Sequence, residues 1–178
     1  WLLPHANPLL KVTIIPRGQS LGAAWYLPDE RHLTTKEQLK DEMASTIGGR
    51  VAEEIVNGVI STGALSDLEK LSKQAYAMVT YFGMSDKVGN ISFYDSSGRA
   101  EMSLSKPYSE KTAELIDSEV KKLIDEAHKT ATRILTENRE GFEELAQLLL
   151  EKEVIFSEDL EKIFGPRKGG KDPNKLFD

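Results

Sequence analysis

The feature that most constrains the fold is an apolar stripe of helical spacing in the second half of the chain. Apolar side chains recur three or four positions apart from Leu115 to Leu135. This spacing places them on one face of a helix. We therefore predict a long helix that starts after Pro107 or Ser109 and buries this face.

A second stripe predicts a helix in the first half of the chain. Thr34 fits the N-cap position and Glu37 the third helical position, as in a capping box. From there apolar residues recur every fourth position, and the pattern ends near Asn57 and Gly58. Its members are Leu39, Met43, Ile47, Val51 and Ile55.

Three shorter patterns predict the remaining helices. One helix begins around Ala64 and ends at Gly83, and two others are expected at 143–152 and at 157–164, where Ser157 would be the cap. The apolar face of the first consists of Leu68, Leu71, Ala75, Met78, Val79 and Phe82.

Short β-branched and aromatic runs between the helices predict minor β structure. Residues 12–15 and 22–27 read as two strands separated by a turn, so they could pair as a small hairpin. A second hairpin is expected from 90–94 and 102–104. The predicted fold class is mainly α, with one or two small β-hairpins.

Composition excludes several functional classes. The 178 residues contain no cysteine, which excludes disulfides and thiolate metal sites. A net charge of −6 argues against nucleic acid as a partner, which normally needs a basic face. The longest apolar runs are far shorter than the roughly 20 residues that span a bilayer. The chain opens at Trp1 without an initiator Met, so we expect a piece of a larger protein.

Two runs in the first half indicate a possible metal ligand. Gly48 and Gly49 lie inside a predicted helix, where glycine costs roughly 1 kcal/mol relative to alanine. We therefore expect something to approach that helix closely. Asp67 falls in the first turn of the next helix. The two features together suggest a helix crossing that aims one carboxylate at a fixed point.

Four blocks carry a resemblance to a known family. They are Lys11–Gly18 (KVTIIPRG), Gly48–Glu54 (GGRVAEE), Ser61–Asp67 (STGALSD) and Phe82–Gly89 (FGMSDKVG). In this order they resemble the peptidase domain of the FtsH/AAA protease family, whose members are membrane-anchored, ATP-dependent zinc proteases. The resemblance extends from about residue 2 to residue 166.

One motif of that family is absent from this chain. The family's zinc-binding His-Glu-x-x-His helix would lie just before Trp1, and the general-base glutamate is expected there. His5, His32 and His128 do not replace it, because none has a partner four residues away. We expect each of these histidines to be a surface residue or a loop residue rather than a ligand. The chain as given is therefore expected to be inactive by itself.

The resemblance assigns roles to two acidic residues. A catalytic zinc commonly has three protein ligands and an open position for water, and the resemblance makes Asp67 the third ligand. Without the resemblance, Asp67 would be read as an acid favoured at a helix start. The family pattern also suggests that Glu53 lies near the zinc and orients a histidine. The alternative for Glu53 and Glu54 is that both are solvated surface acids.

The second predicted strand is a candidate substrate-binding edge. An exposed strand edge can pair with an extended peptide backbone with little side-chain preference. This suits the degradation of varied unfolded chains, although Trp25 and Tyr26 more often pack in a core. The candidate residues are Gly22, Ala23, Ala24, Trp25, Tyr26 and Leu27.

The resemblance implies a proteolytic domain at 1–166, followed by a flexible tail at 167–178. It implies zinc as the cofactor, a ring of six copies, unfolded polypeptide substrates, and an attached AAA ATPase domain that holds ATP and magnesium. This chain has no phosphate-binding Gly-x-x-x-x-Gly-Lys-[Ser/Thr] loop and cannot supply that ATPase itself. The fragment is expected to make no membrane contact.

Two further questions stay open at the level of sequence. The parent could sit in a bacterial inner membrane with this domain in the cytoplasm, or in the mitochondrial inner membrane facing the matrix. The alternative function is a non-catalytic, ring-forming interaction module that has lost the metal helix. The retained Asp67 argues against that alternative, because a site without metal has no chemical need for the carboxylate.

Overall fold

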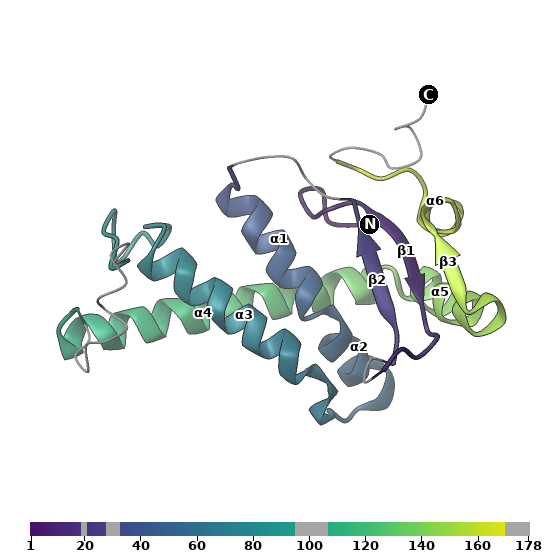
Figure 1. Cartoon of the computed structure of the whole chain (residues 1–178), viewed down its shortest axis with the longest axis horizontal. Coiled ribbons are helices and arrows are strands. Elements are labelled where there is room, and N and C mark those ends of the chain that lie inside the picture. Colours follow the sequence, from purple (N-terminus) through teal and green to yellow (C-terminus); the bar gives the residue numbers. More distant parts are fainter. Residues whose placement is uncertain (19–20, 28–32, 95–106, 170–178) are drawn as a thin grey trace.

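The computed structural model describes residues 1–18, 21–27, 33–94 and 107–169. Within these residues the chain is mainly α-helical with one small sheet, which confirms the predicted fold class (Figure 1). The helices are α1 Lys36–Thr46, α2 Gly48–Asn57, α3 Leu65–Thr80, α4 Glu110–Glu137, α5 Arg139–Lys152 and α6 Ser157–Phe164, with a 3-10 turn η1 at Thr62–Ala64. The strands are β1 Leu9–Thr13, β2 Ala23–Tyr26 and β3 Val154–Phe156.

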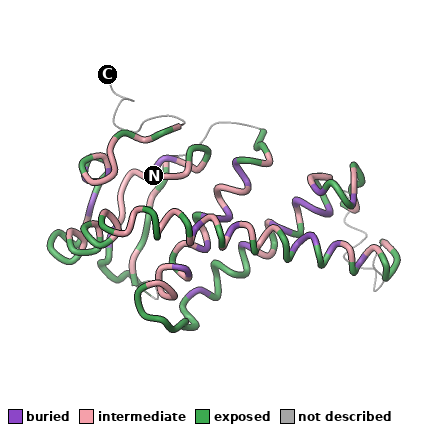
Figure 2. The backbone as a smooth tube through the Cα atoms, turned by 180° about the vertical axis from the view of Figure 1, so that it is seen from behind, coloured by how far each residue is buried: buried purple, intermediate pink, exposed green. Residues whose placement is uncertain are grey.

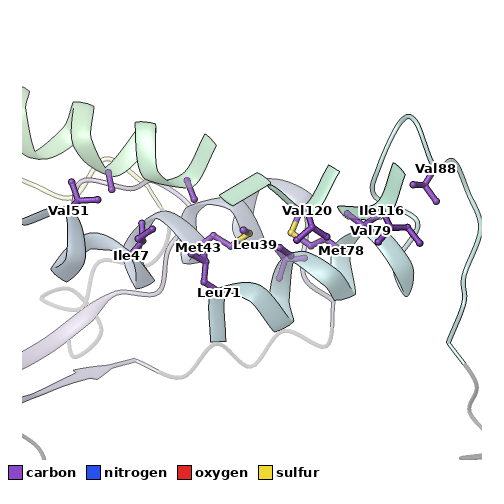
Figure 3. Close-up of a cluster of buried hydrophobic side chains, with 13 residues drawn as sticks. Leu39, Met43, Ile47, Val51, Leu71, Met78, Val79, Val88, Ile116 and Val120 are labelled. Atoms are coloured by element: carbon purple, nitrogen blue, oxygen red, sulfur yellow. The ribbon is translucent and has the colours of Figure 1, made fainter. Parts of the chain in front are cut away.

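The long helix α4 is the central helix of the bundle. It starts at the Ser109 cap, whose side chain accepts a hydrogen bond from the N–H of Thr112, and it packs against α1, α2 and α3. Figure 3 shows the apolar side chains of these helices pointing toward one another. The buried cluster is formed by Leu39, Met43, Ile47, Val51, Leu71, Ala75, Met78, Val79, Val88, Ile116, Val120, Ala127 and Ala131.

The helix predicted from Thr34 to Asn57 is two helices. Thr35, rather than Thr34, is the N-cap of α1, and it exchanges hydrogen bonds with Gln38 as a capping box. The break comes at Ile47, which ends α1 and precedes α2. The stripe stays buried across this joint, so its spacing alone could not reveal the break.

The expectation that Gly48 and Gly49 allow a close contact is wrong for the described chain. A methyl group added at either glycine would meet no atom within 4 Å apart from its own helix and chain neighbours. Both glycines instead stand directly after the joint at Ile47, where low helix propensity helps one helix to end and the next to begin.

The three-stranded sheet has the order β2-β1-β3, and both pairings are antiparallel. The first predicted hairpin is confirmed as a pairing of β1 with β2, with an irregularity between Leu9 and Lys11. Its first strand was predicted at 12–15 and instead covers Leu9–Thr13. Strand β3 was not predicted, because it has three residues and pairs with a strand far away in sequence. It places Ile155 opposite Val12.

The second predicted hairpin is not formed at its first strand. Residues 90–94 contain no strand, and the N–H of Phe93 donates instead to the carbonyl of Thr80 at the end of α3. Its partner segment, 102–104, lies outside the described residues.

The last part of the chain forms a separate small layer against the sheet. Ile155 of β3 and Leu160 of α6 are buried outside the bundle cluster. Helix α5 begins at Arg139, four residues before the predicted start, and Ser157 is the first residue of α6 rather than its cap. The N–H of Phe156 donates to the Asp159 carboxylate at 3.2 Å, which closes the start of α6.

The two ends of the described chain lie against each other. Arg167, which was placed in the predicted flexible tail, donates to the backbone carbonyls of Leu3 and Ala6. Residues 170–178 of that tail are not described. Figure 2 shows that burial is concentrated along the inner faces of the bundle, while the outer turns are exposed. Each helix in the described part of the chain is too short or too polar to span a membrane.

Candidate functional site

One pocket collects residues from the sheet, from the α1–α2 joint and from the start of α3. Its volume is about 400 Å³. It is lined by Ala6, Asn7, Tyr26, Glu42, Ser45, Thr46, Gly49, Asp67 and Lys70. The pocket therefore brings Asp67 together with the end of the candidate edge strand β2 and with the first residues of the chain.

Asp67 is placed by the start of α3. It occupies the first turn of this helix, as predicted, and its side chain is exposed at the pocket. The N-terminal end of a helix favours a negative charge, so the carboxylate stays available without a buried partner. Among the described residues, no group of three or more His, Cys, Asp or Glu side chains could hold a metal ion. Asp67 can therefore provide one donor but not a complete site.

A second carboxylate and one lysine share the pocket with Asp67. Glu42 of α1 accepts a hydrogen bond from the side-chain amide of Gln74 on α3 at 3.0 Å. Lys70 lies about one helical turn after Asp67 on α3 and lines the same pocket. The hydrogen bond holds Glu42 in place between α1 and α3, so the wall of the pocket opposite the sheet is polar.

Glu53 is engaged with the connection that leads from α2 to α3. One carboxylate oxygen accepts from the hydroxyl of Ser61 at 2.8 Å, and the other accepts from the Ser61 N–H at 3.2 Å. The hydroxyl bond, followed by the backbone bond, holds the pKa of Glu53 below its usual value. Glu53 is therefore hydrogen-bonded while it stays accessible to solvent, so the solvated-acid alternative remains open. The histidine it was predicted to orient is not among its partners in the described chain, so that role stays a prediction.

Strand β2 has the position that substrate pairing requires. It is the outer strand of the sheet, and in the described part of the chain it pairs with β1. Trp25 is half-buried and its ring lies under the ammonium group of Lys11, with 4.4 Å between the nitrogen and the ring centre. Tyr26 is exposed and lines the Asp67 pocket. The last residue of β2 therefore lines the same pocket as the carboxylate.

The three histidines have different surroundings. His5 is exposed, as expected. His128 is half-buried on α4, and its Nε2 lies 2.9 Å from a carboxylate oxygen of Glu54 on α2. Both side chains are still more than a third exposed, so the two residues are surface residues, as expected, that are paired with each other. His32 lies outside the described residues.

Sequence reasoning missed the partners that complete the pocket. Glu42, Ser45 and Thr46 lie on the polar side of α1, where alternation with apolar residues only predicts exposure. Nothing in their spacing reveals that β2 faces them. The hydrogen bonds of Ser61 were equally hidden, although its small polar side chain before a predicted helix is typical of a cap.

Comparison with known proteins gives consistent matches over nearly the whole chain. A family model described as peptidase family M41 matches residues 1–163. The chain is 65% identical over 167 residues to an ATP-dependent zinc metalloprotease FtsH of Parabacteroides distasonis, a match that covers 94% of this chain and 24% of the relative.

Two further relatives come from different lineages. An ATP-dependent zinc metalloprotease FtsH of Rhodothermus marinus is 53% identical over 176 residues, which is 98% of this chain and 25% of the relative. The mitochondrial inner membrane m-AAA protease component AFG3L2 of Mus musculus is 54% identical over 167 residues, which is 94% of this chain and 21% of the relative. The chain thus spans about a quarter of the length of these curated relatives. The resemblance read from the four sequence blocks is confirmed.

Proposed function

Because this chain belongs to peptidase family M41, we propose that it is the proteolytic domain of a membrane-anchored, ATP-dependent zinc metalloprotease in which Asp67 is a zinc ligand. The observation that carries this proposal is the pocket that Asp67 and Tyr26 of the edge strand both line. A carboxylate beside the outer strand of the described sheet is the arrangement needed to cut a peptide held in extended form. The names of the relatives, which are zinc metalloproteases, support the same activity.

The donor chemistry of the pocket suits zinc. Zinc accepts carboxylate oxygen together with histidine nitrogen, and a catalytic site needs three protein ligands. Asp67 would be one of them, while the two histidines and the general-base glutamate would come from a His-Glu-x-x-His helix preceding Trp1 in the parent. When bound, zinc lowers the pKa of its water toward 7 and polarises the scissile carbonyl. The task of this chain is to hold Asp67 and the substrate near each other.

Strand β2 would align the substrate. An extended polypeptide that pairs with residues 22–27 adds a strand to the sheet through main-chain hydrogen bonds, which are the same for every sequence. Tyr26 would lie where the added strand reaches the pocket. This arrangement explains how one site can cut the many unfolded or membrane proteins that we propose as substrates.

The whole protein would add partners that this chain does not contain. We propose an attached AAA ATPase domain with ATP and magnesium, and a ring of six copies. We propose a bacterial inner membrane location with this domain in the cytoplasm, and two of the relatives are bacterial. The mitochondrial relative leaves open the mitochondrial inner membrane, with the domain facing the matrix.

The decisive experiment measures zinc in the full-length protein. Wild type should bind one zinc per chain and cleave casein with ATP, whereas Asp67→Ala should lose the metal and the cleavage while keeping its helical circular dichroism. Asp125→Ala, which removes an exposed aspartate from α4, is the matched control and should behave as wild type. Full zinc content and activity in Asp67→Ala would overturn the assignment. A full-length wild type without zinc would favour the non-catalytic ring module.

A further inference from the structure

Three side-chain hydrogen bonds from α2 converge on a single residue of the α2–α3 connection. Arg50 donates from Nη1 to the carbonyl of Ser61 at 2.8 Å. Glu53 accepts from the Ser61 hydroxyl at 2.8 Å and from its N–H at 3.2 Å. The backbone donor, the backbone acceptor and the hydroxyl of Ser61 are therefore all held by two residues that lie three positions apart on one helix. We call this group of three residues the Ser61 clamp.

Ser61 is linked to Asp67 without an irregular segment between them. The Ser61 hydroxyl accepts from the N–H of Gly63 and so caps the turn η1. This turn runs directly into α3 at Leu65, and Asp67 is the third residue of that helix. Because η1 is continuous with α3 and is capped by Ser61, the position of Ser61 helps to set where α3 begins and thus where its first-turn carboxylate lies.

The clamp is itself braced against the long helix. The Arg50 side chain is only 18% exposed, and its Nε lies 3.8 Å from a carboxylate oxygen of Glu54. Glu54 is in turn paired with His128 of α4 at 2.9 Å. The guanidinium group of Arg50 is therefore held near Ser61 by Glu54, whose carboxylate is in turn held by His128.

The first turn of α3 has little apolar burial, which shows why a clamp is needed. Leu65 and Leu68 of α3 are exposed in the described chain, and the first fully buried residue of this helix is Leu71. Between the buried Ala64 of η1 and Leu71, apolar burial therefore contributes little to fixing the turn that carries Asp67. Hydrogen bonds between exposed groups add little to the free energy of unfolding, but they can select one conformation of a connection.

From these contacts we propose that Arg50 and Glu53 are positioning residues for Asp67, acting through Ser61 without touching the metal or the substrate. This inference rests on the proposed role of Asp67 as a zinc ligand. It also gives Glu53 a task within this chain that differs from orienting a histidine. Loss of the clamp would leave the carboxylate present but displaced, so zinc would bind more weakly rather than not at all.

The test compares clamp variants in the full-length holoenzyme. Zinc affinity is measured by competition with a chelator, and casein cleavage is measured at rising zinc. Arg50→Ala and Glu53→Ala should weaken zinc binding about 10- to 100-fold, the usual effect of removing a group that supports a ligand. Excess zinc should restore their cleavage, whereas it should not restore Asp67→Ala. Arg50→Lys, which can still donate to the Ser61 carbonyl, should recover part of the affinity.

Matched controls separate positioning from a general loss of stability. Arg133→Ala and Glu69→Ala each break an exposed ion pair within one helix, so neither should change zinc affinity. Hydrogen exchange in the metal-free chain gives a readout without zinc, since the amides of residues 61–67 should exchange faster in the clamp variants than in these controls. If a clamp variant does not fold, Ser61→Ala can be measured in the same way. It removes only the hydroxyl, so the expected loss of zinc affinity is smaller.

The outcomes distinguish this inference from the proposed function. If Asp67→Ala loses zinc but the clamp variants keep wild-type affinity and wild-type exchange, the positioning role is overturned and the proposed function stands. If Asp67→Ala keeps its zinc, the proposed function falls and this inference falls with it. Weakened affinity that excess zinc restores, together with faster exchange at 61–67, supports the clamp.

Discussion

The helical bundle and the sheet layer of this molecule are stabilised in different ways. In the bundle, side chains of α1, α2, α3 and α4 form one continuous apolar cluster. The sheet layer consists of the three strands together with α5 and α6. None of the α5 residues is fully buried, and charged contacts contribute to the stability of this layer. There Lys152 of α5 donates to the carboxylate of Asp159 at the start of α6, at 2.8 Å. The Asp67 pocket lies where the bundle meets β2.

This difference suggests a division of tasks. Substitutions in a close-packed apolar cluster strongly lower the free energy of unfolding, because each lost methylene leaves a cavity. The strength of polar contacts depends instead on pH, and the loss of a single hydrogen bond can weaken them. We propose that a site at this border would gain access to extended peptides from the exposed sheet edge, while the helices that carry it are anchored in the bundle.

The largest predicted effect concerns the bundle. Leu71 of α3 is 1% exposed, so Leu71→Ala should lower the free energy of unfolding by about 2–5 kcal/mol through lost burial and a new cavity. The matched control is Leu150→Ala in α5, where the side chain is 69% exposed. It should change stability by no more than about 0.5 kcal/mol. Urea unfolding of the chain measures both, and equal losses would contradict the comparison.

The bundle is also the part that the sequence predicted best. The stripes of α3 and α4 gave their extent, because most residues that repeat with helical spacing are the ones that pack. Leu68 and Phe82 were predicted on the apolar face of α3 but are exposed. The break at Ile47 was not predicted, since the stripe continues through it. Strand β3 was missed because a three-residue strand has no measurable alternation and its partner β1 lies far away in sequence.

The site was predictable only in part, for a related reason. Asp67 was placed in the first turn of a helix from local pattern and resemblance, and the structure puts it there. Its neighbours Tyr26 and Glu42 come from other elements, and no spacing in the sequence encodes their approach. The hydrogen bonds on Ser61 depend on the angle between α2 and α3, which is a property of the folded chain.

The second predicted effect concerns the pH response of the sheet layer. The bond from Lys152, followed by the bond from the Phe156 N–H, holds the pKa of Asp159 below its usual value. A carboxyl whose pKa is lowered by folding contributes stability above its unfolded pKa of about 3.9. That contribution is lost as the pH falls through the lower pKa of the folded state.

Asp159→Asn should therefore destabilise the chain by about 1–3 kcal/mol at pH 7, and the difference from wild type should shrink as the pH is lowered toward 3. Urea unfolding at several pH values measures this. Asp86→Asn is the control, because Asp86 is 98% exposed and lies 3.7 Å from Lys36. It should show little difference at any pH. A constant deficit of Asp159→Asn across the range would show that packing, and not charge, holds this layer.

The smallest predicted effect concerns the joint beside the pocket. Because a methyl group at Gly48 or Gly49 would meet no neighbouring atom within 4 Å, each Gly→Ala change should raise the free energy of unfolding by about 0.4–1 kcal/mol, chiefly by restricting the unfolded chain. Thermal melts of the chain measure this gain. Only Gly49 lines the Asp67 pocket, so Gly48→Ala is its matched control in the full-length protein. If both variants are stabilised but Gly49→Ala alone loses casein cleavage, the glycine serves the pocket rather than the fold. Destabilisation by both would instead restore the close helix contact that the described chain does not contain.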